Sequence, residues 1–269
     1  MEPLHKLVLK VTYLGTSYSG SQVQENSITV QDLLDTALRK LFNQNELKTI
    51  FSGRTDSGVH ALTQIVSADV RVKRPEAAVC KALRTLLPVD IVVTDAWYVA
   101  DKLHPRFDAK RRVYLYNIFC GRAPLYMKDV VWSLPGTLDI RAMRQAAKVL
   151  IGTHDFSSFC AARSYADNKV RTMYRLTLRV SKVADWLGST RSGGIMITVR
   201  VEADAFLHHM VRNIVAVLVD VGRGRMTTKD VQRILKLKDR KQLLSATAPA
   251  SGLVLYDVQY ADVRKKRSV

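Results

Sequence analysis

The order of strand-like and helix-like segments is the feature that most restricts the fold of this chain. Apolar side chains alternate along the segment from Lys6 to Tyr13 with the period of a half-buried strand. They then recur at helical spacing from Val30 to Asn43, after Thr29, a residue type that caps helix N-termini. Farther along, strand-like segments follow one another without an intervening helix. A doubly wound parallel sheet needs strict alternation, so the order predicts an α+β fold with a largely antiparallel mixed sheet and flanking helices.

The remaining predicted elements fill the chain without an internal repeat or a low-complexity linker. Further strands are predicted at 48–52, 64–72, 91–99, 111–119, 170–183, 195–203 and 253–261. Further helices are predicted at 75–87, 140–151 (capped by Asp139), 207–221 and 228–235. The region around Pro105 is the predicted seam between an N-terminal half, 1–104, and a C-terminal half, 105–269.

The charge of the chain indicates its kind of partner. Its 269 residues include 42 Lys and Arg against 24 Asp and Glu, which gives a formal net charge of +18. On a chain of globular composition, this excess points to a polyanion, with nucleic acid favoured over an anionic membrane surface. A basic run at residues 264–267 adds non-specific attraction.

Cysteine usage and hydropathy indicate the compartment. The three cysteines, Cys80, Cys120 and Cys160, form no CxxC pair and are too few for a disulfide framework. The sequence has no apolar stretch long enough to span a bilayer and no signal peptide before the first predicted strand. We expect a cytoplasmic protein, with the nucleus or an organelle left open.

A loop with two glycines, Ser52–Ala61, is the first candidate for chemistry. Gly53 and Gly58 bracket Arg54 and Asp56, so a guanidinium and a carboxylate lie two residues apart. Glycines allow a tight turn and a close approach of the backbone to a ligand. The alternative is an ordinary hairpin turn, since Asp, Ser and Gly are common turn residues.

The segment 206–213 is the second candidate. On the predicted helix, His208 and Arg212 share a face, whereas the adjacent His208 and His209 point in different directions and make a poor chelate. We therefore expect no metal site there. Arg212 lies among apolar residues, and a partly buried guanidinium needs an anionic partner, either structural or catalytic.

The strand predicted at 111–119 is the third candidate. Its alternation places Arg112, Tyr114 and Tyr116 on one face, an arrangement suited to stacking on bases and contacting phosphates. The alternative is that the tyrosines pack within the protein, which is the more common role of strand tyrosines.

Taken together, these segments resemble the TruA family of tRNA pseudouridine synthases, from about residue 7 to 260. Residues 53–61 are similar to the family's catalytic loop, with Ser57 where many members have alanine. Ser21 departs from the pattern, because many relatives have tryptophan there, and 186–194 resembles an insertion in a hairpin. The other similar segments are 13–20, 87–91, 106–114, 154–159, 170–172, 206–213 and 248–253.

The resemblance implies a fold and a reaction. The fold is an α+β pseudouridine synthase fold of two related halves with a central active-site cleft, the halves forming one catalytic unit. The reaction breaks the N1 glycosidic bond of a flipped-out uridine and joins C5 to C1′. No redox or energy cofactor is expected, because the product is an isomer of the substrate. The partner is tRNA, most plainly its anticodon stem-loop, with other structured RNA left open, and the enzyme is expected to be a homodimer.

The resemblance also implies roles for individual residues. Asp56 is the catalytic carboxylate, Arg212 pairs with it, and Tyr114 stacks on the uracil and serves as a base. Leu253 belongs to the apolar wall of the substrate pocket. The residues expected to bind RNA are Arg54, Arg106, Arg111, Arg112, Arg171 and His208. The residues alone do not distinguish attack of Asp56 on C1′, attack on C6, or proton abstraction.

Two other functions compete with this interpretation. The first is an RNA-binding or tRNA-folding protein that does not need Asp56 for its role. The second is an RNA hydrolase that uses Asp56 with histidines as acid and base, a weaker hypothesis because its product would be shortened RNA.

Overall fold

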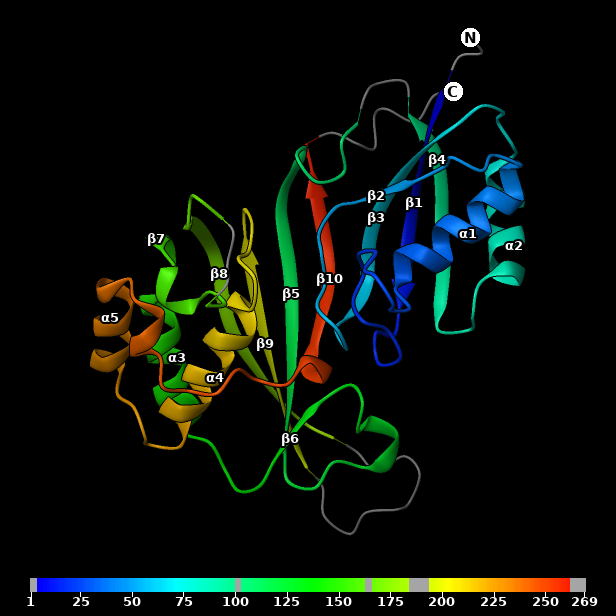
Figure 1. The fold of residues 1–269 in the computed structure, drawn as a ribbon. Helices are drawn as coiled ribbons and strands as arrows, with labels where there is room; N and C mark the ends of the chain where they lie inside the picture. The colour runs from blue at the N-terminus through cyan, green and yellow to red at the C-terminus, as the bar shows by residue number, and fades with distance from the viewer. Residues whose placement is uncertain (1–3, 100–102, 163–165, 184–193, 262–269) are drawn as a thin grey trace. The chain divides into compact units, whose positions relative to one another are not determined.

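A computed structural model describes residues 4–99, 103–162, 166–183 and 194–261. The chain divides into two compact units, residues 1–110 with 255–269, and residues 111–254. Each unit combines helices with a mostly antiparallel sheet (Figure 1), so the predicted α+β class is confirmed. The described residues include no helix with the length and apolar character needed to cross a membrane.

The first unit is built on the strand order β4-β1-β3-β10, with β2 added to β3. β1 pairs antiparallel with both β3 and β4, and its side chains Leu7, Leu9 and Val11 are fully buried. Helices α1 and α2 contact each other, and α2 packs on β4. The bounds are β1 His5–Tyr13, α1 Val30–Phe42, β2 Thr49–Phe51, β3 His60–Val70, α2 Glu76–Leu86, β4 Ile91–Val99 and β10 Leu253–Tyr260.

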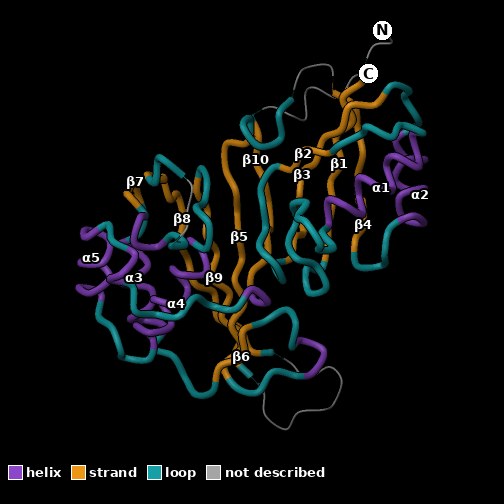
Figure 2. The backbone as a smooth tube through the Cα atoms, in the orientation of Figure 1, coloured by secondary structure: helices purple, strands orange, loops and turns teal. Residues whose placement is uncertain are grey.

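The second unit is built on the strand order β5-β9-β8-β7, with the short strand β6 parallel to β5. Helix α3 contacts α4, α5 and β8, and the three helices gather together (Figure 2). The bounds of the strands are β5 Ala109–Cys120, β6 Trp132–Leu134, β7 Gly152–Asp155, β8 Val170–Lys182 and β9 Ile195–Ala203. The bounds of the helices are α3 Ile140–Val149, α4 Met210–Gly222 and α5 Thr228–Leu237.

Local sequence signals explain where most helices begin. Thr29 accepts a hydrogen bond from the amide of Asp32, and Asp139 accepts one from the amide of Ala142, as expected for N-caps. Thr227 and Asp230 form a complete capping box at α5. Caps of this kind satisfy amides that have no partner within the helix.

Two predicted boundaries near the candidate site are wrong. β3 begins at His60 rather than at residue 64, so the loop carrying Asp56 spans only 52–59. α4 begins at Met210 rather than at residue 207, because His209 adopts a left-handed backbone with φ of 62°. The predicted insertion at 186–194, apart from Gly194, and the basic run at 264–267 lie outside the described residues.

Candidate active site

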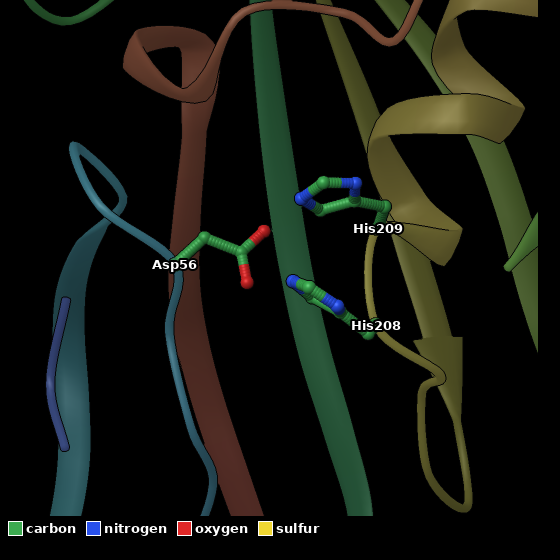
Figure 3. Close-up of side chains that lie close together, drawn as sticks. All are labelled: Asp56, His208 and His209. Carbon is green, nitrogen blue, oxygen red and sulfur yellow. The ribbon is translucent and has the colours of Figure 1, made fainter. Parts of the chain in front are cut away.

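The Asp56 loop, residues 52–59, connects β2 to β3 in the first unit (Figure 3). Its side chains alternate in burial, with Arg54 exposed, Thr55 buried and Asp56 half-buried. The loop thus buries Thr55 and leaves its two neighbours, Arg54 and Asp56, at least partly exposed.

Buried polar side chains hold this loop, and we call Tyr13, Ser21, Ser52, Thr55 and Gln64 the loop-anchoring network. Gln64 Nε2 donates to the Gly53 carbonyl oxygen at 2.8 Å, and Ser52 Oγ donates to Gln64 Oε1 at 2.5 Å. The hydroxyls of Tyr13 and Thr55 are 2.8 Å apart. Burial raises the pKa of Tyr13 to about 12, although hydrogen bonds from its neighbours act to lower it. The phenol therefore stays protonated at physiological pH.

Two glycines let a second loop, residues 14–29, lie directly against the Asp56 loop. A Cβ at Gly15 would lie 2.0 Å from the Val59 carbonyl oxygen. Gly20 has a φ of 101°, and its Cβ would lie 2.8 Å from the Thr55 carbonyl oxygen. Within the Asp56 loop, Gly58 has a positive φ of 76°, which permits the turn that brings the Val59 amide to the Asp56 carbonyl oxygen.

Strand β5 of the second unit carries Arg112, Tyr114 and Tyr116 on one face, as the alternation predicted. Tyr114 is buried and meets the ring of Phe206 edge-on, with centroids 5.1 Å apart. Arg112 Nη1 donates to the Asp204 carbonyl oxygen at 2.7 Å. Tyr116 is fully buried, and this burial raises the pKa of its hydroxyl. Tyr116 is thus a core residue, in agreement with the alternative that the strand tyrosines pack within the protein.

Arg212 and Tyr116 together fix the segment that leads to Leu253. Arg212 Nε donates to the Ala248 carbonyl oxygen at 2.7 Å, and Tyr116 Oη donates to the Pro249 carbonyl oxygen at 2.8 Å. Gly252 packs on the Tyr116 ring, where a Cβ would come within 2.6 Å of Cε1. Leu253, next in the chain, is buried at the start of β10.

His208 and His209 precede α4, and this corrects the prediction based on a helix from residue 207. Because the helix begins at Met210, His208 does not share a helical face with Arg212. The two imidazoles lie side by side with centroids 4.1 Å apart, instead of pointing in different directions (Figure 3). The left-handed backbone at His209 is uncommon for a residue other than glycine and places the pair outside the helix.

The other basic residues predicted to bind RNA occupy varied surroundings. Arg111 lies on the opposite face of β5 from Tyr114, where its Nη1 is 2.9 Å from a carboxylate oxygen of Glu202 and its guanidinium covers the Tyr174 ring. Arg171 donates to the carbonyl oxygens of Asn168 and Val170. Arg106 is exposed in the loop before β5, beside the Phe107 ring.

Comparison with known proteins decides the family. The family model described as tRNA pseudouridine synthase matches residues 10–108 and 146–261. The chain belongs to this family. It is 42% identical over 251 residues to tRNA pseudouridine synthase A of Pseudothermotoga lettingae. The aligned region covers 93% of this chain and 97% of the relative.

Other members of the family match over similar lengths. The enzyme of Bacillus licheniformis is 39% identical, covering 93% of the chain and 97% of the relative, and that of Bacillus subtilis is 38% identical, covering 95% and 99%. Among solved structures, a Cbf5-Nop10-Gar1 complex and an archaeal Nop10-Cbf5 complex match with TM-scores of 0.31 and 0.32. The first is 12% identical, and the match covers 79% of this chain and 45% of the chain in that structure. The second is 10% identical, and the match covers 91% of this chain and 58% of the chain in that structure. Similarity this weak carries no argument.

In this member of the family, sequence reasoning missed how the candidate residues are supported. It assigned no contact to Phe206 on Tyr114, to Tyr116 beneath the Pro249 segment, or to Ser21 beside Thr55. One signal was present in the sequence, since the polar Gln64 directly precedes the apolar pair Ile65 and Val66 in the predicted strand. A buried polar side chain needs a partner, and the Asp56 loop supplies it.

Proposed function

We propose that this protein converts uridine to pseudouridine in tRNA, with the Asp56 carboxylate as the catalytic group. The family supports this activity, and the observation that carries the role of Asp56 is the anchored loop that presents it beside Arg54. In the reaction, the N1–C1′ bond breaks, the uracil turns, and C5 bonds to C1′. The proton displaced from C5 leaves and N1 takes one up, so the atoms balance without a cofactor.

We assign the remaining groups according to their chemistry. The Tyr114 ring stacks on the uracil, and its hydroxyl oxygen acts as a base that accepts a proton when it is in the deprotonated, phenolate form. Arg212 provides a guanidinium that favours an ionised carboxylate, and Leu253 contributes apolar surface to the uracil pocket. Arg54, Arg106, Arg111, Arg112, Arg171 and His208 contact the RNA, for which the net charge of +18 provides attraction that weakens with salt.

The experiment is nucleoside analysis of uridine-labelled tRNA after incubation with the protein. Wild type should produce pseudouridine, whereas Asp56→Ala and Asp56→Asn should produce none while binding tRNA with nearly the wild-type Kd. Full activity in both variants would remove Asp56 from the chemistry. Binding without any product from wild type would favour the non-catalytic RNA-binding function, and shortened RNA would favour the hydrolase.

Two finer points belong to the same proposal. We infer that the protein acts as a homodimer and that it functions in the cytoplasm, supported by the family resemblance. Sedimentation of the protein with and without tRNA tests the first point, and fractionation of cells tests the second. A monomer at working concentrations, or enrichment in another compartment, would contradict them.

A further inference from the structure

We propose that Ser21 and Tyr13 are positioning residues for the reaction, because they fix Thr55 and thereby place the neighbouring Asp56. This inference rests on the proposed catalytic role of Asp56. Neither side chain belongs to the Asp56 loop, since Tyr13 ends β1 and Ser21 lies in the loop that follows. They act on the loop through hydrogen bonds.

Thr55 is held at three of its polar atoms. Its amide donates to Ser21 Oγ at 2.8 Å. Its carbonyl oxygen accepts from the Ser21 amide at 3.1 Å. Its hydroxyl is 2.8 Å from Tyr13 Oη. A residue fixed at its amide, carbonyl and side chain has little rotational freedom left, so the next residue in the chain leaves it in a defined direction.

Gln64 extends this hold to the other side of Arg54. Its amide nitrogen donates to the Gly53 carbonyl oxygen at 2.8 Å and lies 3.4 Å from Tyr13 Oη. The backbone is thus fixed at Gly53 and at Thr55, the residues on either side of Arg54, and Asp56 follows Thr55 directly. None of these hydrogen bonds uses the Arg54 or Asp56 side chain, and together they fix the backbone that carries both.

The burial of the network argues that it has a role beyond filling space. Ser21, Ser52 and Gln64 are fully buried, and Tyr13 and Thr55 are nearly so. Burying polar groups is costly unless each finds a partner, and apolar side chains fill a core without that cost. The hydrogen bonds of this network converge on the backbone next to Asp56. Because the Tyr13 pKa is about 12, its hydroxyl remains neutral and acts by position rather than by proton transfer.

The test compares Ser21→Ala and Tyr13→Phe with Ser67→Ala. Ser67 is a matched control, because this buried serine of β3 belongs to the same unit and its Oγ has no hydrogen-bond partner among the described residues. Three quantities are measured on the full chain: the single-turnover rate of bound tRNA, the Kd for tRNA, and hydrogen exchange of the Thr55 amide.

We expect Ser21→Ala and Tyr13→Phe to lower the bound rate by about 10–100-fold, since small displacements of a reacting group have effects of this order. The tRNA Kd should change little. Exchange at Thr55 should accelerate by about tenfold in Ser21→Ala, which removes the acceptor of that amide. Ser21→Thr keeps a hydroxyl and should restore most of the rate, and Ser67→Ala should match wild type in all three measurements.

The double variant Ser21→Ala/Tyr13→Phe adds a second criterion. Because both side chains act through Thr55, its rate loss should be smaller than the product of the two single losses. Wild-type rates in both single variants, or equal losses in Ser67→Ala, would overturn the proposal. If wild type makes no pseudouridine, the proposed function fails instead, and the exchange measurement still decides whether Ser21 holds Thr55.

Discussion

The Asp56 loop of the first unit and the Arg212 helix of the second unit fix their functional groups in different ways. In the loop, side chains from neighbouring segments bind the backbone at Gly53 and Thr55, on either side of Arg54 and directly before Asp56. In the helix, the Arg212 side chain itself binds a backbone carbonyl, that of Ala248. A carboxylate on a short side chain follows its backbone closely, whereas a guanidinium on a long flexible stem must be held at its head.

This comparison predicts the largest effect for Arg212→Lys. Lysine keeps the charge but lacks the Nε donor that binds the Ala248 carbonyl oxygen, so its head group is not held in place. We expect the single-turnover rate on bound tRNA to fall by about 10²-fold or more. Arg225→Lys, at an exposed arginine beside Asp220, is the control and should retain the wild-type rate. Equal rates for the two variants would show that charge alone suffices at position 212.

A smaller effect, on the stability of the first unit, is expected for Gly15→Ala. The added Cβ would lie 2.0 Å from the Val59 carbonyl oxygen, so two backbone segments must separate. We expect the free energy of unfolding to fall by about 1–3 kcal/mol, as for other overpacked sites. Gly53→Ala is the matched control for stability, because its Cβ would have, apart from its chain neighbours, no atom of the described residues within 4 Å. Denaturant unfolding measures the free energy of unfolding of both variants. An equal loss of stability in the two would show that the close approach of the backbones at Gly15 does not cause the destabilisation.

The smallest effects are expected from two carboxylates that respond to pH in opposite directions. In the first unit, burial raises the pKa of Asp35, although hydrogen bonds from Thr49 act to lower it. In the second unit, burial acts to raise the pKa of Asp155, but hydrogen bonds from Ser157 hold it below its ordinary value. The folded state therefore favours protonated Asp35 and ionised Asp155.

The signs of the two pH dependences follow from linkage. Asp155 contributes stability above its ordinary pKa of 3.8, and this contribution is lost as the pH falls through the lowered value of the folded state. Relative to wild type, Asp155→Asn should thus be most destabilised near neutral pH and least in acid. Asp35→Asn should show the reverse trend, with its relative stability improving as the pH rises through the raised pKa. Chemical denaturation from pH 3 to pH 7 gives the free energy of unfolding of both variants relative to wild type. If this difference changed with pH in the same direction for both variants, the opposite pKa shifts of Asp35 and Asp155 would be contradicted.

The sequence by itself determined the fold class, most elements and the residue types of the candidate site. Strand periodicity, helix spacing and caps such as Thr29 and Asp139 depend on residues close in the chain, and these signals were confirmed. The ordered motifs also indicated the family, which the comparisons confirmed.

Only the tertiary structure decided how the candidate residues are supported. Ser21 and Thr55 lie 34 residues apart, and Arg212 and Ala248 lie 36 apart, so no local pattern pairs them. The start of α4 was misplaced because His209 adopts a left-handed backbone that local periodicity does not reveal. The chain from Leu255 onward belongs to the first unit, although the preceding residues belong to the second. Periodicity reports which face of an element is buried, whereas long-range hydrogen bonds depend on which elements that burial brings together.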